Sequence, residues 1–378
     1  MMKLEFPKED LTFAQSLSAV VKVGGDLWVG GDEGTKLVGL RQSRAGGAYR
    51  KFGEIDLVAE FDLPGKPAKP GGDMPEVDIE GLDWDEAGGY LWVIGSHSMK
   101  RNAASFVSKK GFRIEDEENL KRLGKVTADG NRYLLGRLPM RTDARGKSGM
   151  VPHQKQSKAH FRARLDCTQR SSDLLKALRG DPLLEPFLSK KRPLPGKDNG
   201  LDFEGLAWDG KGGRLIVGLR GPVLRGMAIL LEIQVEEDFR GVGKVGRLEL
   251  THDEHSASSY RRHFLDLDGL GVRDLCFRGD DLLVLAGPTM PIDWPVTIYS
   301  WKGARHQMDG GERFGWQEDG SVQRLIREEL PETERKRDRP EAITLWKDNK
   351  ILVVCDAPSS ARLAPPAAVK VEEFQLNS

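Results

Sequence analysis

The sequence predicts an all-β protein folded as a single β-propeller, with five blades favoured and six as the alternative. Five copies of one pattern lead to this prediction: two apolar or alternating runs joined by a short turn rich in Gly, Asp or Asn, which is typical of a β-hairpin. Hairpins that recur about 65 residues apart fit the blades of a propeller. The 44 Gly among 378 residues fit a chain with many turns.

The five hairpins are spread along the whole chain. They span Leu17–Gly34, Asp78–Ser98, Leu201–Pro222, Val272–Met290 and Arg339–Pro358. A third alternating segment follows each hairpin, namely Thr35–Arg41, Arg132–Leu138, Met227–Val235, Val296–Trp301 and Ala368–Leu376. We expect the segment 3–6 to pair with the last blade and to close the ring, because closure removes free strand edges that invite aggregation.

One interval, from Glu80 to Glu204, is much longer than the others. We interpret residues 99–194 as an insertion within a single domain of residues 1–378; a degenerate sixth blade is the alternative. The insertion contains two predicted strands and two predicted helices: Arg132–Leu138, Phe161–Asp166, Glu115–Leu123 and Ser171–Leu178. Ser171 and Ser172 precede the second helix as candidate N-caps. The stretch Arg145–Ser157 has little apolar content, so we expect the ring to fold without it.

The insertion is basic, whereas the whole chain is neutral. From Lys100 to Arg192 there are 23 Lys or Arg against 10 Asp or Glu, while the full sequence has 58 of each class. This segment is either a solvated loop set or a docking surface for an acidic partner. Aromatic residues do not alternate with the basic ones, which argues against a single-stranded nucleic-acid site.

Nothing in the sequence indicates a membrane protein. No apolar run approaches the length of a membrane-spanning helix, and the first ten residues lack the apolar core of a signal peptide. We therefore expect a cytoplasmic location and no membrane partner.

Polar residues flank every hairpin at the same two points. A residue just before the first strand and one just after the second strand lie at the same end of a blade, so the five sets should meet at one mouth of the central channel. Several carboxylates near one axis repel each other, and a hard cation such as Ca²⁺ relieves this repulsion. The predicted metal ligands are Glu80, Glu204, Asp274 and Glu341.

A bound cation would polarise a phosphoryl or carbonyl oxygen, which predicts Ca²⁺-assisted hydrolysis of a phosphorylated or lactone-like small molecule. His97, oriented by Glu80, is the candidate general base. The alternative is a non-catalytic module that binds a small anionic molecule through arginines. Its candidate ligand-binding residues are Ser98, Arg101, Arg220, Arg225, Arg273, Thr289 and Ser359. A protein-interaction scaffold that uses the basic insertion is a third reading, so the sequence leaves open whether the protein is an enzyme.

Several motifs resemble one bacterial family over nearly the whole chain. They include D-I-E-G-L at Asp78–Leu82, G-S-H-S-M-K-R at Gly95–Arg101 and P-G-K-D-N-G-L-D-F-E-G-L at Pro195–Leu206. The sequence resembles domain-of-unknown-function family 3616, which implies no settled activity. The E-G-L-x-W-D hairpin is also similar to hairpins of phytase-like esterase and regucalcin-type lactonase propellers. The Asn and Asp metal ligands of those lactonases have no matching position here.

Overall fold

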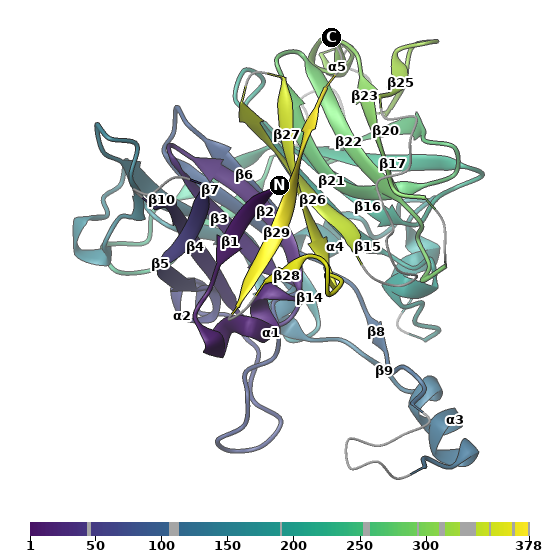
Figure 1. The fold of residues 1–378 in the computed structure, drawn as a ribbon. Coiled ribbons are helices and arrows are strands. Elements are labelled where there is room, and N and C mark those ends of the chain that lie inside the picture. Colours follow the sequence, from purple (N-terminus) through teal and green to yellow (C-terminus); the bar gives the residue numbers. More distant parts are fainter. Residues whose placement is uncertain are drawn as a thin grey trace.

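The computed structural model describes residues 1–43, 47–105, 113–189, 191–251, 258–292, 295–309, 314–325, 338–347, 349–364 and 367–376. We describe its main strands as units I to V, each of which begins with one of the predicted hairpins (Figure 1). Unit I consists of β2 (Leu17–Val23), β3 (Asp26–Gly31), β4 (Lys36–Gln42) and β5 (Ala48–Asp56). Unit II consists of β6 (Ile79–Asp85), β7 (Tyr90–Gly95), β10 (Leu135–Thr142) and β12 (Ala163–Leu165). Unit III consists of β15 (Asp202–Asp209), β16 (Arg214–Gly221), β17 (Met227–Ile233) and β20 (Arg261–Asp266).

Units IV and V complete the set. Unit IV consists of β21 (Gly271–Arg278), β22 (Asp281–Gly287), β23 (Thr297–Trp301) and β25 (Val322–Arg324). Unit V consists of β26 (Arg339–Lys347), β27 (Lys350–Asp356), β29 (Ala368–Gln375) and β1 (Met2–Glu5). The short additional strands are β8 (Lys100–Arg101), β9 (Val126–Thr127), β11 (Ser148–Met150), β13 (Cys167–Thr168), β14 (Ser171–Ser172), β18 (Val235–Asp238), β19 (Gly246–Leu250), β24 (Phe314–Trp316) and β28 (Leu363–Ala364). The helices are α1 (Leu11–Ala14), α2 (Leu57–Phe61), α3 (Asp116–Gly124), α4 (Asp173–Ala177) and α5 (Ala304–Met308).

The first strands of the five units surround a common axis. They contact one another in a closed cycle, β2 to β6 to β15 to β21 to β26 and back to β2. Side chains tie neighbouring members together: Asp83 Oδ2 accepts the Trp208 N–H at 2.6 Å, and Asp274 Oδ2 accepts the Ile343 N–H at 2.7 Å. The fold is therefore all-β and propeller-like, as the hairpin repeats predict.

The second strand of a hairpin is apolar on both faces because each face packs against a different neighbour. In β7, Leu91 and Val93 contribute to the cluster shared with unit I, whereas Trp92 and Ile94 contribute to the cluster shared with unit III. Strands β22 and β27 divide their side chains in the same way. Successive side chains of a strand point to opposite faces, so a continuous apolar run contributes side chains to two apolar clusters, one on each face.

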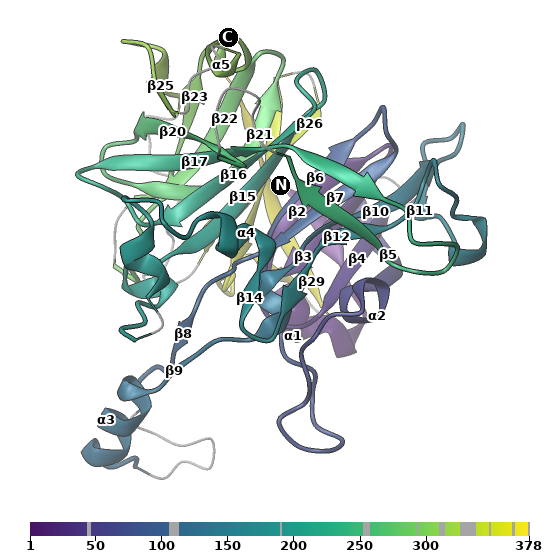
Figure 2. The same ribbon diagram turned by 180° about the vertical axis from the view of Figure 1, so that it is seen from behind.

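The segment 99–194, which the sequence predicts to be an insertion, serves several structural roles. Two of its strands, β10 and β12, belong to unit II. The segment around β8, β9 and α3 forms an arm that projects from the body (Figures 1 and 2). The predicted N-cap of the second helix is confirmed, because Ser172 Oγ accepts the Leu175 N–H at 3.2 Å. No helix among the described residues is long and apolar enough to cross a membrane.

Strand β1 joins the two ends of the chain to one sheet. It pairs antiparallel with β29 of unit V and parallel with β5 of unit I. Units I and V consequently share one nine-stranded sheet.

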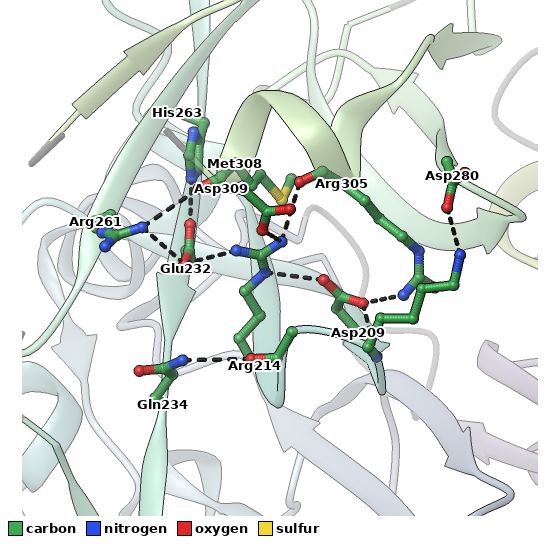
Figure 3. A network of polar contacts seen from close by, with 12 residues as sticks. Asp209, Arg214, Glu232, Gln234, Arg261, His263, Asp280, Arg305, Met308 and Asp309 are labelled. Atoms are coloured by element: carbon green, nitrogen blue, oxygen red, sulfur yellow. Dashed lines mark hydrogen bonds and ion pairs between the residues drawn. The ribbon is translucent and has the colours of Figure 1, made fainter. Parts of the chain in front are cut away.

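A buried ion-pair network joins units III and IV at the end of β15 farther from Glu204 (Figure 3). Arg214 donates to Asp209 at 2.9 Å and to Asp309 at 2.7 Å, and Glu232 accepts from His263 at 2.8 Å. Every carboxylate in this network has a cationic or imidazole partner. The network thus holds β15, β16, β17 and β20 against α5. Its fully paired carboxylates distinguish it from the polar groups at the opposite end of the ring.

Candidate functional site

Each inner strand carries a β-bulge at the same point of its hairpin. In every first hairpin the pairing register shifts around one equivalent residue, and these residues are Ser18, Glu80, Glu204, Arg273 and Glu341. The hairpins of units III and V each contain a second shift, between Asp202 and Phe203 and between Leu345 and Lys347. A bulge leaves its extra residue out of the hydrogen-bond ladder and re-aims the side chain. All five side chains line one pocket on the axis, here called the axial pocket, of about 40 Å³. Equivalent backbone irregularities therefore build the site.

Three arginines in this pocket are already matched with carboxylates. Arg220 pairs with Asp202 and Glu204, and Arg273 pairs with Glu341 while its Nε lies 3.7 Å from Glu204. Arg339 likewise pairs with Asp356. The side of the pocket formed by units III to V is therefore close to electrical balance.

The side formed by units I and II differs, because Asp32 and Glu80 there have no such ion-pair partner among the described residues. Asp32 follows β3 and has a buried Oδ1 with no hydrogen-bond partner in the described structure. Burial, reinforced by the negative charges of Asp356 and Asp78, raises the pKa of Asp32 to about 7. Loss of solvation, followed by repulsion from Glu204 and Asp78, raises the pKa of Glu80 well above its usual range. Both groups therefore retain protons at pH values where carboxyls are ordinarily ionised.

The paired side contains two glutamates with opposite pKa shifts. Burial raises the pKa of Glu204 to about 8 in spite of Arg220 and Arg273. Burial also acts to raise the pKa of Glu341, but Arg273 and Arg339 outweigh it and hold this pKa below its usual range. The axial pocket thus combines an ionised carboxylate with protonated carboxyls.

We expect Asp32 to make the protein less stable as the pH rises from about 4 to 7. In this window the folded state retains a proton that an unfolded Asp has released, so stability falls by at most about 1.4 kcal/mol per pH unit from this group. The free energy of unfolding of the Asp32→Asn variant should depend less on pH. At pH 8 the variant should gain stability relative to the parent protein. Urea midpoints measured from pH 4.5 to 8 test this, with Glu86→Gln on an exposed turn as the control. An unchanged pH slope in Asp32→Asn would contradict the assignment.

Three of the four predicted metal ligands meet in the axial pocket, and the fourth does not. Glu80, Glu204 and Glu341 line it, whereas the equivalent position in unit IV is Arg273. Asp274 lies one residue later, where its two oxygens accept the N–H groups of Leu275 and Ile343. Among the described residues, no group of three or more His, Cys, Asp or Glu side chains is arranged to hold a metal ion.

The predicted ligand-binding residues divide into three sets. Arg220, Arg273 and Thr289 line the axial pocket. Ser98 and Arg101 line a larger cavity outside it, where Arg101 Nε donates to Asp198 at 2.7 Å.

The other two residues of that prediction lie outside both cavities. Arg225 occupies an exposed turn with φ 54°. The Ser359 hydroxyl donates to Asp338 at 2.8 Å. Neither residue lines the axial pocket or the larger cavity.

His97 is buried and separate from Glu80. Its Nδ1 lies 2.9 Å from the Gly95 carbonyl, and its ring lies against Tyr133 and Phe203. Burial lowers the pKa of His97 to about 4, so the imidazole is neutral at pH 7. It lines a small cavity of about 30 Å³ under the insertion, whereas Glu80 faces the axis. The structure therefore does not bring together the predicted pair of base and orienting carboxylate.

Sequence reasoning missed several residues of the pocket. Ser18 occupies the bulge of unit I, and Lys197 and Arg339 line the same space. Aligning S-A-V at Ser18 with E-G-L at Glu80 by their apolar residues would have identified Ser18. Lys197 comes from a loop before β15, and no repeat pattern marks it.

Comparisons with known proteins place the chain in a family. It matches the family described as "Protein of unknown function (DUF3616)" over residues 16–372. No curated protein sequence matches it. Among solved structures, it is similar to a PQQ-bound aldose sugar dehydrogenase from Streptomyces coelicolor, with 11% identity, 95% of each chain covered and a TM-score of 0.37. It is also similar to a protein from Lactobacillus plantarum, with 10% identity, coverage of 95% of this chain and 84% of that one, and a TM-score of 0.31. The extent of the family match shows that the chain belongs to the DUF3616 family.

Proposed function

We propose that this protein binds a small, neutral, polar molecule by seating its head group in the axial pocket. The observation that carries the proposal is a set of buried polar atoms without hydrogen-bond partners in the described structure: Glu204 Oε2, Arg220 Nε and Arg273 Nε. Buried polar groups are nearly always hydrogen-bonded, so donors and acceptors left open beside a cavity suit a ligand that supplies both. Hydroxyl groups donate and accept, which favours a polyol head group.

The charge balance of the pocket favours a neutral ligand over an ionic one. An anion would compete with Glu341 and Asp356 for arginines that these carboxylates already neutralise. A divalent cation would in turn compete with those arginines for the carboxylates. Calcium-assisted hydrolysis stays a prediction for which the pocket offers no prepared ligand set among the described residues.

We also propose that the ring counts five blades, one for each unit. Five apolar clusters lie between consecutive units, including the one between units V and I. The long interval then belongs to unit II as an insertion, since β10 and β12 complete that unit.

Acid–base catalysis is the second candidate function. Glu341 is held ionised and Glu204 protonated within one pocket, and both lie beside Arg273. Carboxyl groups with pKa values pushed apart in this way are typical of general acid and base pairs. A turnover assay on a bound ligand would distinguish catalysis from binding alone.

Methyl β-D-glucoside and myo-inositol are suitable neutral probes. We expect a saturable rise in melting temperature, because a ligand at 100 times its Kd adds about 2.7 kcal/mol to the stability of the native state. Glu80→Leu should abolish the rise without unfolding the protein, since it removes a carboxyl that lacks an ion-pair partner in the described structure. Glu86→Leu, on the exposed turn of the same hairpin, is the matched control.

Inorganic phosphate and CaCl₂ serve as the competing probes in this experiment. Saturable stabilisation by phosphate would favour the anion-binding alternative, and stabilisation by Ca²⁺ would favour the metal-assisted one. If neither neutral probe gives a saturable shift that depends on Glu80, the proposal is wrong.

A further inference from the structure

A second, much larger cavity lies directly outside the axial pocket. This outer chamber has a volume of about 960 Å³, which is within the range of roughly 300–1,000 Å³ that small-molecule sites occupy. Asp32, Glu80, Lys197 and Arg220 line both spaces. A molecule with its head in the axial pocket would therefore place the rest of its body in the chamber.

The outer chamber is flanked by large apolar side chains that are exposed to solvent. Ile292 is 52% exposed, Met290 44% and Leu123 39%, and all three line this cavity. Met290 and Ile292 lie between β22 and β23 of unit IV, whereas Leu123 lies near the end of α3 in the arm. These two segments, far apart in the sequence, thus bring apolar surface to one space. Clustered exposed apolar side chains beside a polar pocket mark a binding surface.

The arm is held in place where it meets the chamber. Arg101 Nε donates to Asp198 at 2.7 Å, Lys100 Nζ pairs with Glu76 at 2.8 Å, and the Gly196 N–H donates to the Met99 carbonyl at 3.1 Å. Arg101 also donates to the Leu123 carbonyl at 2.5 Å. These contacts fix the backbone of Leu123 relative to the loop that carries Lys197.

We infer that the ligand is amphipathic, with its polar head in the axial pocket and an apolar portion against Ile292, Met290 and Leu123. The inference rests on the proposed function and adds the chemical class of the molecule. The volume of the chamber and its continuity with the axial pocket favour one small molecule over a protein partner. The apolar portion gains affinity by removing its own surface and that of the three side chains from water.

A series of alkyl β-D-glucosides tests the inference in the full-length protein. Methyl, butyl and hexyl β-D-glucosides share one head group and are used below the concentrations at which micelles form. A buried methylene contributes about 0.8 kcal/mol, so affinity measured by calorimetry should rise about fourfold for each added methylene. In the Leu123→Ser, Ile292→Ser double variant this increment should fall below about twofold, while methyl glucoside affinity is retained. Val242→Ser, at an exposed apolar residue that does not line the chamber, is the control.

The outcomes distinguish a failure of the amphipathic-ligand inference from a failure of the proposed function on which it rests. If methyl glucoside binds but affinity does not rise with chain length, the amphipathic ligand is excluded and the neutral binding site remains. If the double variant keeps the full increment, the apolar portion does not lie against these side chains and the inference is wrong. If methyl glucoside does not bind, the proposed function fails and the inference fails with it.

Discussion

Replacing Arg220 with methionine should lower the free energy of unfolding by about 3–5 kcal/mol, because it leaves buried carboxylates without their partner. Arg220 is 6% exposed and pairs with Asp202 and Glu204, which are both 2% exposed. Methionine retains much of the apolar part of the arginine side chain, so the loss of stability reports mainly on the removal of the positive charge. Urea denaturation at pH 7, followed by far-UV circular dichroism, measures the effect.

The matched control is Arg50→Met. Arg50 pairs with Glu5 at 2.6 Å, but its side chain is 66% exposed, and exposed pairs contribute about 0–1 kcal/mol. The difference between the two variants should narrow at pH 5, where Asp202, left without Arg220, takes up a proton. A loss below about 1 kcal/mol for Arg220→Met at pH 7 would show that these ion pairs are dispensable for stability.

Deleting Arg145–Ser157 should destabilise the protein severely. The sequence predicts a dispensable loop there, but Ser148 is 6% exposed and contacts unit I: its N–H and hydroxyl donate to Asp26 at 2.6 and 2.9 Å. Trp28 Nε1 also donates to the Ser148 hydroxyl at 2.9 Å. Each buried group left unpaired costs about 1–3 kcal/mol, so the deletion should lose several such contributions together.

Thermal melting measured by circular dichroism tests this expectation. Ser148→Ala removes only the hydroxyl and should cost about 1–3 kcal/mol, which keeps the test informative if the deletion variant does not accumulate. Replacing α3 (Asp116–Gly124) with a short Gly-Ser linker is the control, because α3 lies in the projecting arm and contributes no residue to the apolar clusters. If the deletion variant melts at the same temperature as the parent protein, the expectation is wrong and the loop is dispensable, as the sequence predicts.

The hairpins could be predicted from sequence because their signal is local. Turn residues and apolar runs define β6–β7 and β15–β16 without knowledge of the rest of the chain. The same pattern correctly brings Glu80, Glu204 and Glu341 to one pocket. The prediction of Asp274 for unit IV is wrong in position, because alignment of V-R-D-L with E-G-L on the apolar Leu275 assigns the equivalent place to Arg273.

The remaining features depend on contacts that no repeat encodes. The docking of Ser148 on Asp26 joins residues 122 positions apart, and the pKa of Asp32 depends on Asp78 and Asp356 from other units. The hairpin pattern predicts His97 beside Glu80 because both flank one hairpin, but the His97 backbone adopts φ 53° and its ring lines a separate cavity. Such details follow from packing between units, which a single hairpin cannot reveal.

The double pairing of β1 bears on how the ring is assembled during synthesis. Its parallel partner β5 lies within the first 56 residues, whereas its antiparallel partner β29 begins only at Ala368. Contacts close in sequence form sooner than distant ones, because less chain entropy is lost in closing a short loop. The β1 strand can therefore attach to unit I while the rest is still being translated, and it then presents an ordered template edge on which the last strand is captured.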